Sequence, residues 1–280
     1  MEVIVAEKAG FCRGVKSALE QTFMAIKERK AGETICTFGP LIHNRQVLDM
    51  LEDEGVMEEN DIDACAGKKV VIRAHGVPPS LRRQLLAVGA SIIDATCKRV
   101  ARVQAVIKGY ARRGYHIVIV GDADHAEVKG LMGYTEGRGT VISAPEQVDQ
   151  IPLDCGDVLL VAQTTQNGEV FNEVKRRFMQ RFPHGAVENT ICGATHDRQA
   201  EVRRLAANVE AMVVVGGYHS GNTLRLAQVA RESGVPTFHV ETAADLDADK
   251  MKQFHKVGVS AGASTPHWMI LNVVQFLESL

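Results

Sequence analysis

Three cysteines with matching surroundings are the residues of this chain best suited to chemistry. Cys12, Cys97 and Cys192 each end a short strand-like segment and precede a stretch with the apolar spacing of an amphipathic helix. A helix N-terminus stabilises the thiolate, which is the form of cysteine that binds metal. We therefore expect the three thiolates to bind one metal centre, and we favour an iron–sulfur cluster. Three ordinary buried cysteines are the alternative.

The remaining cysteines do not share these surroundings. Cys36, Cys65 and Cys155 have no counterparts elsewhere in the chain, and we interpret them as structural thiols. The sequence contains no Cys-x-x-Cys pair, which excludes a zinc ribbon and a thioredoxin-type motif. Any metal must therefore be bound by cysteines that are far apart in the chain.

Polar side chains gather near the ends of the other predicted strands. Imidazoles, hydroxyls and a carboxamide occur there beside glycines that expose backbone N–H groups, and such a set binds anions. No Gly-x-x-x-x-Gly-Lys-Ser/Thr loop is present, so we predict that these groups surround a phosphate or diphosphate themselves. Taken singly, each is as well explained by a helix cap or a structural contact. The candidates are His43, Asn44, His75, His125, Glu127, Gln163, Thr164, Thr165, Ser220, Asn222 and Ser264.

His125 and Glu127 are the candidate pair for proton transfer. If the chain is extended there, residues two apart face the same side, and a carboxyl beside an imidazole can pass a proton. The alternative for Glu127 is a solvated carboxylate at the start of a helix.

An alternation of strands and helices, repeated three times, must position these residues. Each cysteine is followed by a helix, a strand with a polar loop, a second helix, an acidic connector, another strand and a third helix. The third repeat lacks a final strand, which the N-terminal segment can supply. We therefore predict an α/β fold of three pseudo-threefold-related units with mostly parallel sheets around a central iron–sulfur cluster. The units are residues 13–97, 98–192, and 193–280 completed by the strand in 1–12.

Composition limits the possible partners. The chain has 280 residues, of which 45% are hydrophobic and 24% charged, and its net charge is −2. This charge gives no reason to expect nucleic acid or an anionic membrane surface as a partner. No apolar run approaches the roughly 18 residues of a membrane helix, and the first residues lack a basic leader. We expect a cytoplasmic protein without a nucleotide cofactor, because no Gly-x-Gly-x-x-Gly fingerprint is present.

Several motifs resemble those of the 4-hydroxy-3-methylbut-2-enyl diphosphate reductase family, also called the LytB family. They occur in the family's order from residue 10 to residue 266, so the resemblance covers nearly the whole chain. The ordered set is far more specific than any one motif. It comprises Gly-Phe-Cys-Arg-Gly-Val, Gly-Pro-Leu-Ile-His-Asn, Ala-His-Gly-Val, Asp-Ala-Thr-Cys, His-Ala-Glu-Val, Gln-Thr-Thr, Thr-Ile-Cys, His-Ser-Gly-Asn-Thr and Ala-Gly-Ala-Ser-Thr-Pro.

The resemblance implies an oxidoreductase that makes isopentenyl and dimethylallyl diphosphate, the last step of the non-mevalonate isoprenoid pathway. It implies a [4Fe–4S] cluster with three Cys ligands and one open iron, and ferredoxin or flavodoxin as the external electron donor. Glu127 would supply protons, and Thr164 would help to position the substrate hydroxyl and its proton relay. Residues matching the diphosphate ligands are His43, His75, His125, Ser220, Asn222 and Ser264.

Two positions depart from the family pattern, and two other functions compete with the reductase. Lys98 replaces the proline that commonly follows the second cysteine, and Gly221 replaces a serine. Neither is a cluster ligand or the proposed acid. Three thiolates and a water would also suit a zinc hydrolase, and a labile cluster would suit a non-catalytic redox sensor.

Overall fold

The computed structural model describes residues 1–280 as three separate parallel sheets of four strands each. Helices alternate with the strands along the chain, which confirms the predicted α/β class. The first sheet has the strand order β3-β2-β4-β5, and the second has β7-β6-β8-β9. The third sheet has the order β1-β12-β10-β11, so the first and last strands of the chain are neighbours.

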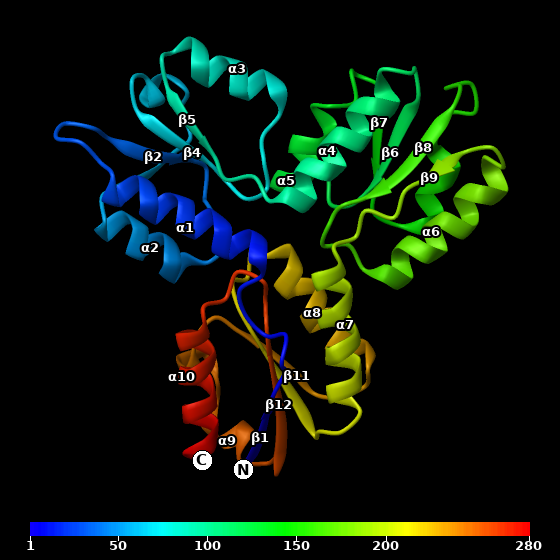
Figure 1. Cartoon of the computed structure of the whole chain (residues 1–280). Helices are drawn as coiled ribbons and strands as arrows, with labels where there is room; N and C mark the ends of the chain where they lie inside the picture. The colour runs from blue at the N-terminus through cyan, green and yellow to red at the C-terminus, as the bar shows by residue number, and fades with distance from the viewer. The chain divides into compact units, whose positions relative to one another are not determined.

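The N-terminal strand completes the third sheet. β1 (Glu2–Val5) pairs in parallel with β12 (Lys256–Ala261), in a register that sets Val3 against Val257. In Figure 1 the blue strand lies beside the orange-red one, with both chain termini at one end of this sheet. The other strands are β10 (Ala211–Val215) and β11 (Thr237–Val240). The predicted unit boundaries themselves stay a prediction.

The chain groups into two compact units. We call Met1–Val15, His43–Leu48 and Gly193–Leu280 the C-terminal unit, which contains the third sheet. Lys16–Ile42 and Asp49–Cys192 form the central unit, which contains the other two sheets.

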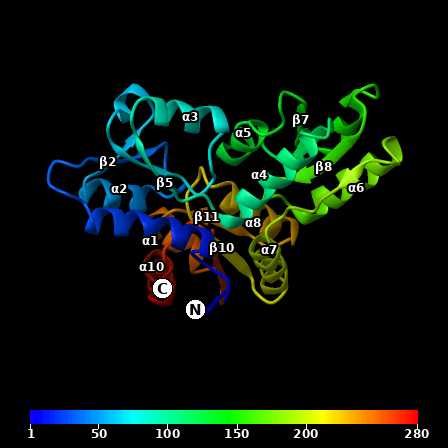
Figure 2. The ribbon, with the colours of Figure 1, turned by 45° about the horizontal axis from the view of Figure 1, so that its top comes forward.

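Helices cover both faces of the third sheet because its central strand is apolar on both sides. All five residues of β10 are buried, as is typical of a parallel strand between helices. Val213 packs with residues of α10 (His267–Glu278), whereas Met212 and Val214 pack with α7 (Gly193–Ala206) and α8 (Gly221–Glu232). Figure 2 shows α10 and α7 on opposite sides of this sheet.

The sheets of the central unit are built in the same way. β8, which is buried throughout, lies between β6 and β9. α4 and α5 contribute to the apolar cluster on one face of this sheet, and α6 to the cluster on the other.

The bounds of the remaining elements of both units are as follows. The strands are β2 (Ile35–Phe38), β3 (Val56–Glu59), β4 (Lys69–Ile72), β5 (Ser91–Asp94), β6 (His116–Val120), β7 (Gly139–Ile142), β8 (Val158–Ala162) and β9 (Ala186–Val187). The remaining helices are α1 (Arg13–Lys27), α2 (Arg45–Asp53), α3 (Pro79–Ala87), α4 (Lys98–Ala111), α5 (Ala126–Met132), α6 (Gly168–Arg181) and α9 (Ala248–Met251).

One element of each sheet was missed by the sequence analysis. The acidic connectors contain the edge strands β3, β7 and β11, each of four residues. Such short strands, with only one buried residue each, carry little apolar periodicity.

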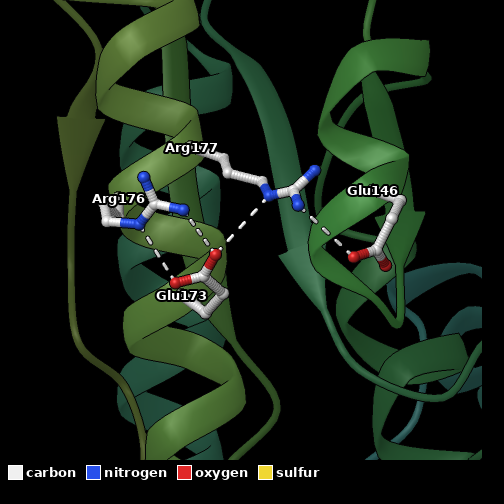
Figure 3. Close-up of polar contacts among 4 residues, drawn as sticks. All are labelled: Glu146, Glu173, Arg176 and Arg177. Carbon is white, nitrogen blue, oxygen red and sulfur yellow. Dashed lines mark hydrogen bonds and ion pairs between the residues drawn. The ribbon is translucent and has the colours of Figure 1, made fainter.

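A surface network of charged residues joins α6 to the 3₁₀ helix Pro145–Gln150. The guanidinium of Arg177 lies 3.5 Å from Glu173 and 3.5 Å from Glu146, while Arg176 also contacts Glu173 (Figure 3). Because these groups are exposed, we expect each pair to contribute about 0–1 kcal/mol. The network therefore adds little to the apolar contacts beneath it.

None of the helices has the length and apolar character required to cross a membrane.

Candidate functional site

The three cysteines singled out by their surroundings occupy equivalent positions relative to their own sheets. The N–H group of each donates to a carbonyl just beyond the neighbouring strand: Cys12 to Ala263 at 3.1 Å, Cys97 to Ala74 at 3.0 Å. In the same way, the N–H of Cys192 donates to the carbonyl of Thr164 at 2.8 Å. Each cysteine is followed directly by a helix, namely α1, α4 and α7. The repeat predicted from sequence thus includes the same backbone hydrogen bond at each of the three cysteines.

The exposure of the thiols separates these cysteines from two of the others. Cys12, Cys97 and Cys192 are partly exposed, whereas Cys36 and Cys65 are buried. Burial, together with the neighbouring Cys65 thiol, raises the pKa of Cys36 to about 12, so Cys36 stays protonated. By contrast, the Cys12 sulfur accepts a long hydrogen bond from the N–H of Val15 at 3.5 Å, inside α1. Partly exposed thiols at helix starts suit metal-bound thiolates, and Cys36 and Cys65 do not.

In the central unit, Glu127 and Thr164 form a closed pair. The N–H and hydroxyl of Thr164 donate to the two carboxylate oxygens of Glu127, each at 2.7 Å. Only 1% of Glu127 and 5% of Thr164 is exposed. The alternative of a solvated glutamate is therefore wrong. Because the carbonyl of Thr164 also accepts from Cys192, the pair lies next to a candidate metal ligand.

His125 is connected to Glu127 through the backbone of α5. The chain is extended only at His125, and Glu127 already lies in the first turn of α5. The ring Nδ1 of His125 accepts from the N–H of Glu127 at 3.1 Å, so this ring caps the helix. Accepting at Nδ1 places the ring proton of neutral His125 on Nε2. The His125 and His75 rings meet edge to face, with centroids 5.3 Å apart.

The C-terminal unit brings together a second polar group of predicted residues. The Ser264 hydroxyl donates to the carbonyl of His43 at 3.1 Å and lies 3.5 Å from the Ser220 hydroxyl. Ser220 caps α8, and Asn222 lies in the first turn of that helix. The amide nitrogen of Asn222 is buried and has no hydrogen-bond partner. A buried donor without a partner at a helix N-terminus is suited to an anion.

Close packing of the backbone fixes His43 in this group. A Cβ atom at Gly217 would lie 2.7 Å from the carbonyl oxygen of His43, so only glycine allows this approach.

Three of the polar candidates have structural contacts. The side chain of Asn44 caps the start of α2 by accepting from Val47 N–H at 3.1 Å. The side chain of Gln163 accepts from Asp122 N–H and donates to Thr165, so these two residues hold the loop after β8.

Two buried charged residues were missed by the sequence analysis. Arg198 and Glu201 lie on α7, and 6% and 7% of their surfaces are exposed. They contact the loop that leads to Cys12. One signal could have revealed them. The apolar stripe of this segment begins only at Val202, four residues after Arg198, so both charges lie on the line of the buried face.

Comparisons with known proteins agree with the motifs. The family model described as LytB protein matches residues 3–278. A protein of Solidesulfovibrio magneticus named 4-hydroxy-3-methylbut-2-enyl diphosphate reductase is 44% identical over 286 residues, covering 100% of both chains. A protein of the same name from Alkaliphilus oremlandii is 38% identical over 281 residues, again with 100% of both chains covered.

Solved structures give the same result for the fold. The E-1-hydroxy-2-methyl-but-2-enyl-4-diphosphate reductase of Plasmodium falciparum has a TM-score of 0.93 at 27% identity, over 98% of this chain and 87% of that one. A structure described as (E)-4-hydroxy-3-methyl-but-2-enyl diphosphate reductase, the terminal enzyme of the non-mevalonate pathway, has a TM-score of 0.72 at 39% identity, covering 100% of both chains. The chain belongs to the LytB protein family.

Proposed function

We propose that this protein is an oxidoreductase that converts 4-hydroxy-3-methylbut-2-enyl diphosphate to isopentenyl and dimethylallyl diphosphate. The observation that carries this proposal is the full-length similarity, at 38% and 44% identity, to proteins named for that reductase. The reaction breaks the allylic C–O bond, consumes two electrons and two protons, and releases water. It is the terminal step of the non-mevalonate isoprenoid pathway.

Cys12, Cys97 and Cys192 hold a [4Fe–4S] cluster in this proposal, which leaves one iron without a protein ligand. Their partial exposure and their equivalent places at the starts of α1, α4 and α7 support the assignment. When bound, a cluster of this kind supplies the electrons of the reduction. The protein must supply the protons and the anion site.

Glu127 is the proposed proton donor, and Thr164 its relay. A hydroxyl both donates and accepts, so Thr164 can take a proton from a protonated Glu127 while giving its own to the substrate. The two 2.7 Å hydrogen bonds hold the carboxyl in place for this transfer. Burial of the pair keeps bulk water away from the proton path.

The diphosphate is the proposed ligand of the polar groups in both units. The unpartnered amide nitrogen of Asn222 and the hydroxyls of Ser220 and Ser264 offer donors at the start of α8. His43, His75 and His125 complete the proposed set. The N–H groups of the first turn of α8 add a favourable dipole for an anion, including the N–H of Gly221, where the family commonly has serine.

An external protein is the proposed electron donor, and α4 is the element suited to receive it. Between residues 98 and 113 the chain carries six basic residues and no acidic one. This stretch begins directly after Cys97. An acidic carrier such as a ferredoxin or flavodoxin would be attracted to this face, although the whole chain has a net charge of −2.

Anaerobic purification tests the proposal. Iron, sulfide and zinc are measured, and the protein is then assayed with a reduced donor and 4-hydroxy-3-methylbut-2-enyl diphosphate. We expect iron and sulfide at about four each per chain, as a four-iron cluster requires, with formation of both products. A colourless, zinc-loaded protein would favour the hydrolase. An iron–sulfur protein that binds the diphosphate without reducing it would favour the sensor.

A further inference from the structure

One buried arginine connects the chain segments beside two of the proposed cluster ligands. The Nη2 group of Arg198 donates to the carbonyl of Gly10 at 2.7 Å, and its Nη1 group donates to the carbonyl of Ala194 at 3.1 Å. Gly10 precedes Cys12 by two residues, and Ala194 follows Cys192 by two. A single planar guanidinium on α7 therefore joins the first turn of its own helix to the loop at residue 10.

Glu201, one turn further along α7, holds the same loop at a second point. Its two carboxylate oxygens accept from the N–H groups of Glu7 and Lys8, at 2.8 and 2.9 Å. Both N–H groups lie just beyond β1, where the sheet no longer provides partners. The loop from Glu7 to Gly10 is thus held by one acidic and one basic side chain of a single helix.

The loop can adopt this path only through Gly10. Its φ angle is +93°, a conformation that residues with a side chain rarely adopt. A Cβ atom there would also lie 3.2 Å from the carbonyl oxygen of Thr265. The left-handed turn directs the carbonyl of Gly10 to Arg198 and leads into Cys12.

We propose that Arg198, assisted by Glu201, is a positioning residue that fixes the cysteine thiolates at residues 12 and 192 for the cluster. This inference rests on the proposed function, because it takes both thiolates to be cluster ligands. α7 begins directly after Cys192, so the helix that follows one ligand also holds the loop that carries the other. Side chains that hold metal ligands in place commonly change metal affinity by about 10- to 100-fold when they are removed.

Arg198→Met and Arg198→Lys test the proposal. Lysine keeps the charge but has one ammonium, which cannot bridge two carbonyls in a fixed plane. In both variants we expect the cluster to lose iron about 10-fold faster in the presence of a chelator, with a changed visible absorption spectrum. Arg231→Met, at an exposed arginine of α8 in the same unit, is the matched control and should behave as the wild type.

A second measurement separates positioning from general stability. In the cluster-free protein, we expect Cys12 to be alkylated about 10-fold faster in Arg198→Met than in the wild type, the same factor as for iron loss. The melting temperature of the variant should change little. Wild-type rates of iron loss and alkylation in Arg198→Met would overturn the proposal. The proposal would also be overturned if a lower melting temperature of Arg198→Met explained its faster iron loss and alkylation, and if Arg198→Lys restored the wild-type melting temperature and rates.

The two proposals can fail separately. If the wild-type chain binds no iron under anaerobic reconstitution, the proposed function fails. The alkylation rate of Cys12 still decides whether Arg198 controls the position of that thiol.

Discussion

At the scale of single residues, the chemistry of this protein depends on hydrogen bonds that hold reactive groups still. The carboxylate of Glu127 has a donor at each oxygen, both from Thr164. The amide nitrogen of Asn222, by contrast, is buried and has no hydrogen-bond partner. The two hydrogen bonds suit a carboxylate that must keep its orientation through a proton transfer. The unpartnered amide suits a site that binds an anion.

Thr164→Val removes one of these hydrogen bonds while keeping the shape of the side chain. Oxygen Oε2 of Glu127 then lacks its donor in a site where only 1% of the residue is exposed, which costs about 1–3 kcal/mol of stability. We expect kcat to fall about 100-fold, because the relay is broken. Thr164→Ser keeps the hydroxyl and is the control. Equal kcat values for the valine and serine variants would exclude the relay.

The placement of the cysteines, and of Ser220, Asn222 and Ser264, just after strand ends could be predicted from sequence. The positions followed from the repeat, because strand ends of a parallel sheet are predictable. The actual partner of Glu127 could not be predicted. Thr164 lies 37 positions away from it, and only the packing of α5 against the loop after β8 brings them together.

At the scale of elements, α4 combines a buried apolar face with an unusually basic exposed face. Val103 and Ile107 pack against the sheet, while Arg99 and Arg102 face solvent. Neither arginine forms an ion pair, so their charges are available to a partner. The same helix begins directly after Cys97, which brings this charge close to a proposed cluster ligand.

Arg99→Glu/Arg102→Glu tests the basic face of α4. We expect KM for an acidic protein donor to rise about 10-fold and its salt dependence to weaken, because electrostatic steering is lost. Turnover with a small viologen reductant should not change. Lys27→Glu/Lys30→Glu, at two exposed lysines near the end of α1, makes the same change in net charge and is the control. Equal effects of the two double variants would contradict a specific docking face.

Elements were predictable in proportion to how much apolar surface they bury. α6 is an element that the sequence predicts well, because its buried Phe171, Val174 and Phe178 follow helical spacing. The edge strands β3, β7 and β11 were missed, since each has four residues of which only one is buried. The capping role of His125 was missed for another reason: Ser, Thr, Asp and Asn are the usual caps.

At the scale of the whole molecule, the chain closes on itself when β1 pairs with β12. The missing strand of the third repeat predicted this pairing from sequence. The hydrogen bonds of Arg198 and Glu201 to the loop after β1 could not be predicted in the same way, because they depend on where this loop packs against α7. A charge on an apolar stripe signals burial, but it does not identify the partner.

Two partly buried histidines make the stability of the molecule depend on pH. Burial lowers the pKa of His116, whose Nε2 lies 2.8 Å from the Thr140 hydroxyl. Burial also lowers the pKa of His239, although the Gly216 carbonyl partly opposes the shift. Below an unfolded-state pKa of about 6.5, the unfolded chain therefore binds protons that the native chain does not.

The free energy of unfolding should thus decrease as the pH falls from about 6.5, the ordinary histidine pKa, toward 5. Urea unfolding at several pH values measures this decrease. The double variant His116→Gln/His239→Gln should show a smaller decrease than the wild type. An equal or larger decrease in the variant would mean that these imidazoles are not the groups responsible.

The most direct test of the proposed chemistry is the turnover of Glu127→Gln at full cluster content. Glutamine has nearly the same shape but cannot release a proton, so iron content and affinity for the diphosphate should match the wild type. We predict that the rate of product formation with a small reductant falls by about 10²- to 10⁴-fold. A rate near that of the wild type would contradict the assignment of Glu127 as the proton donor.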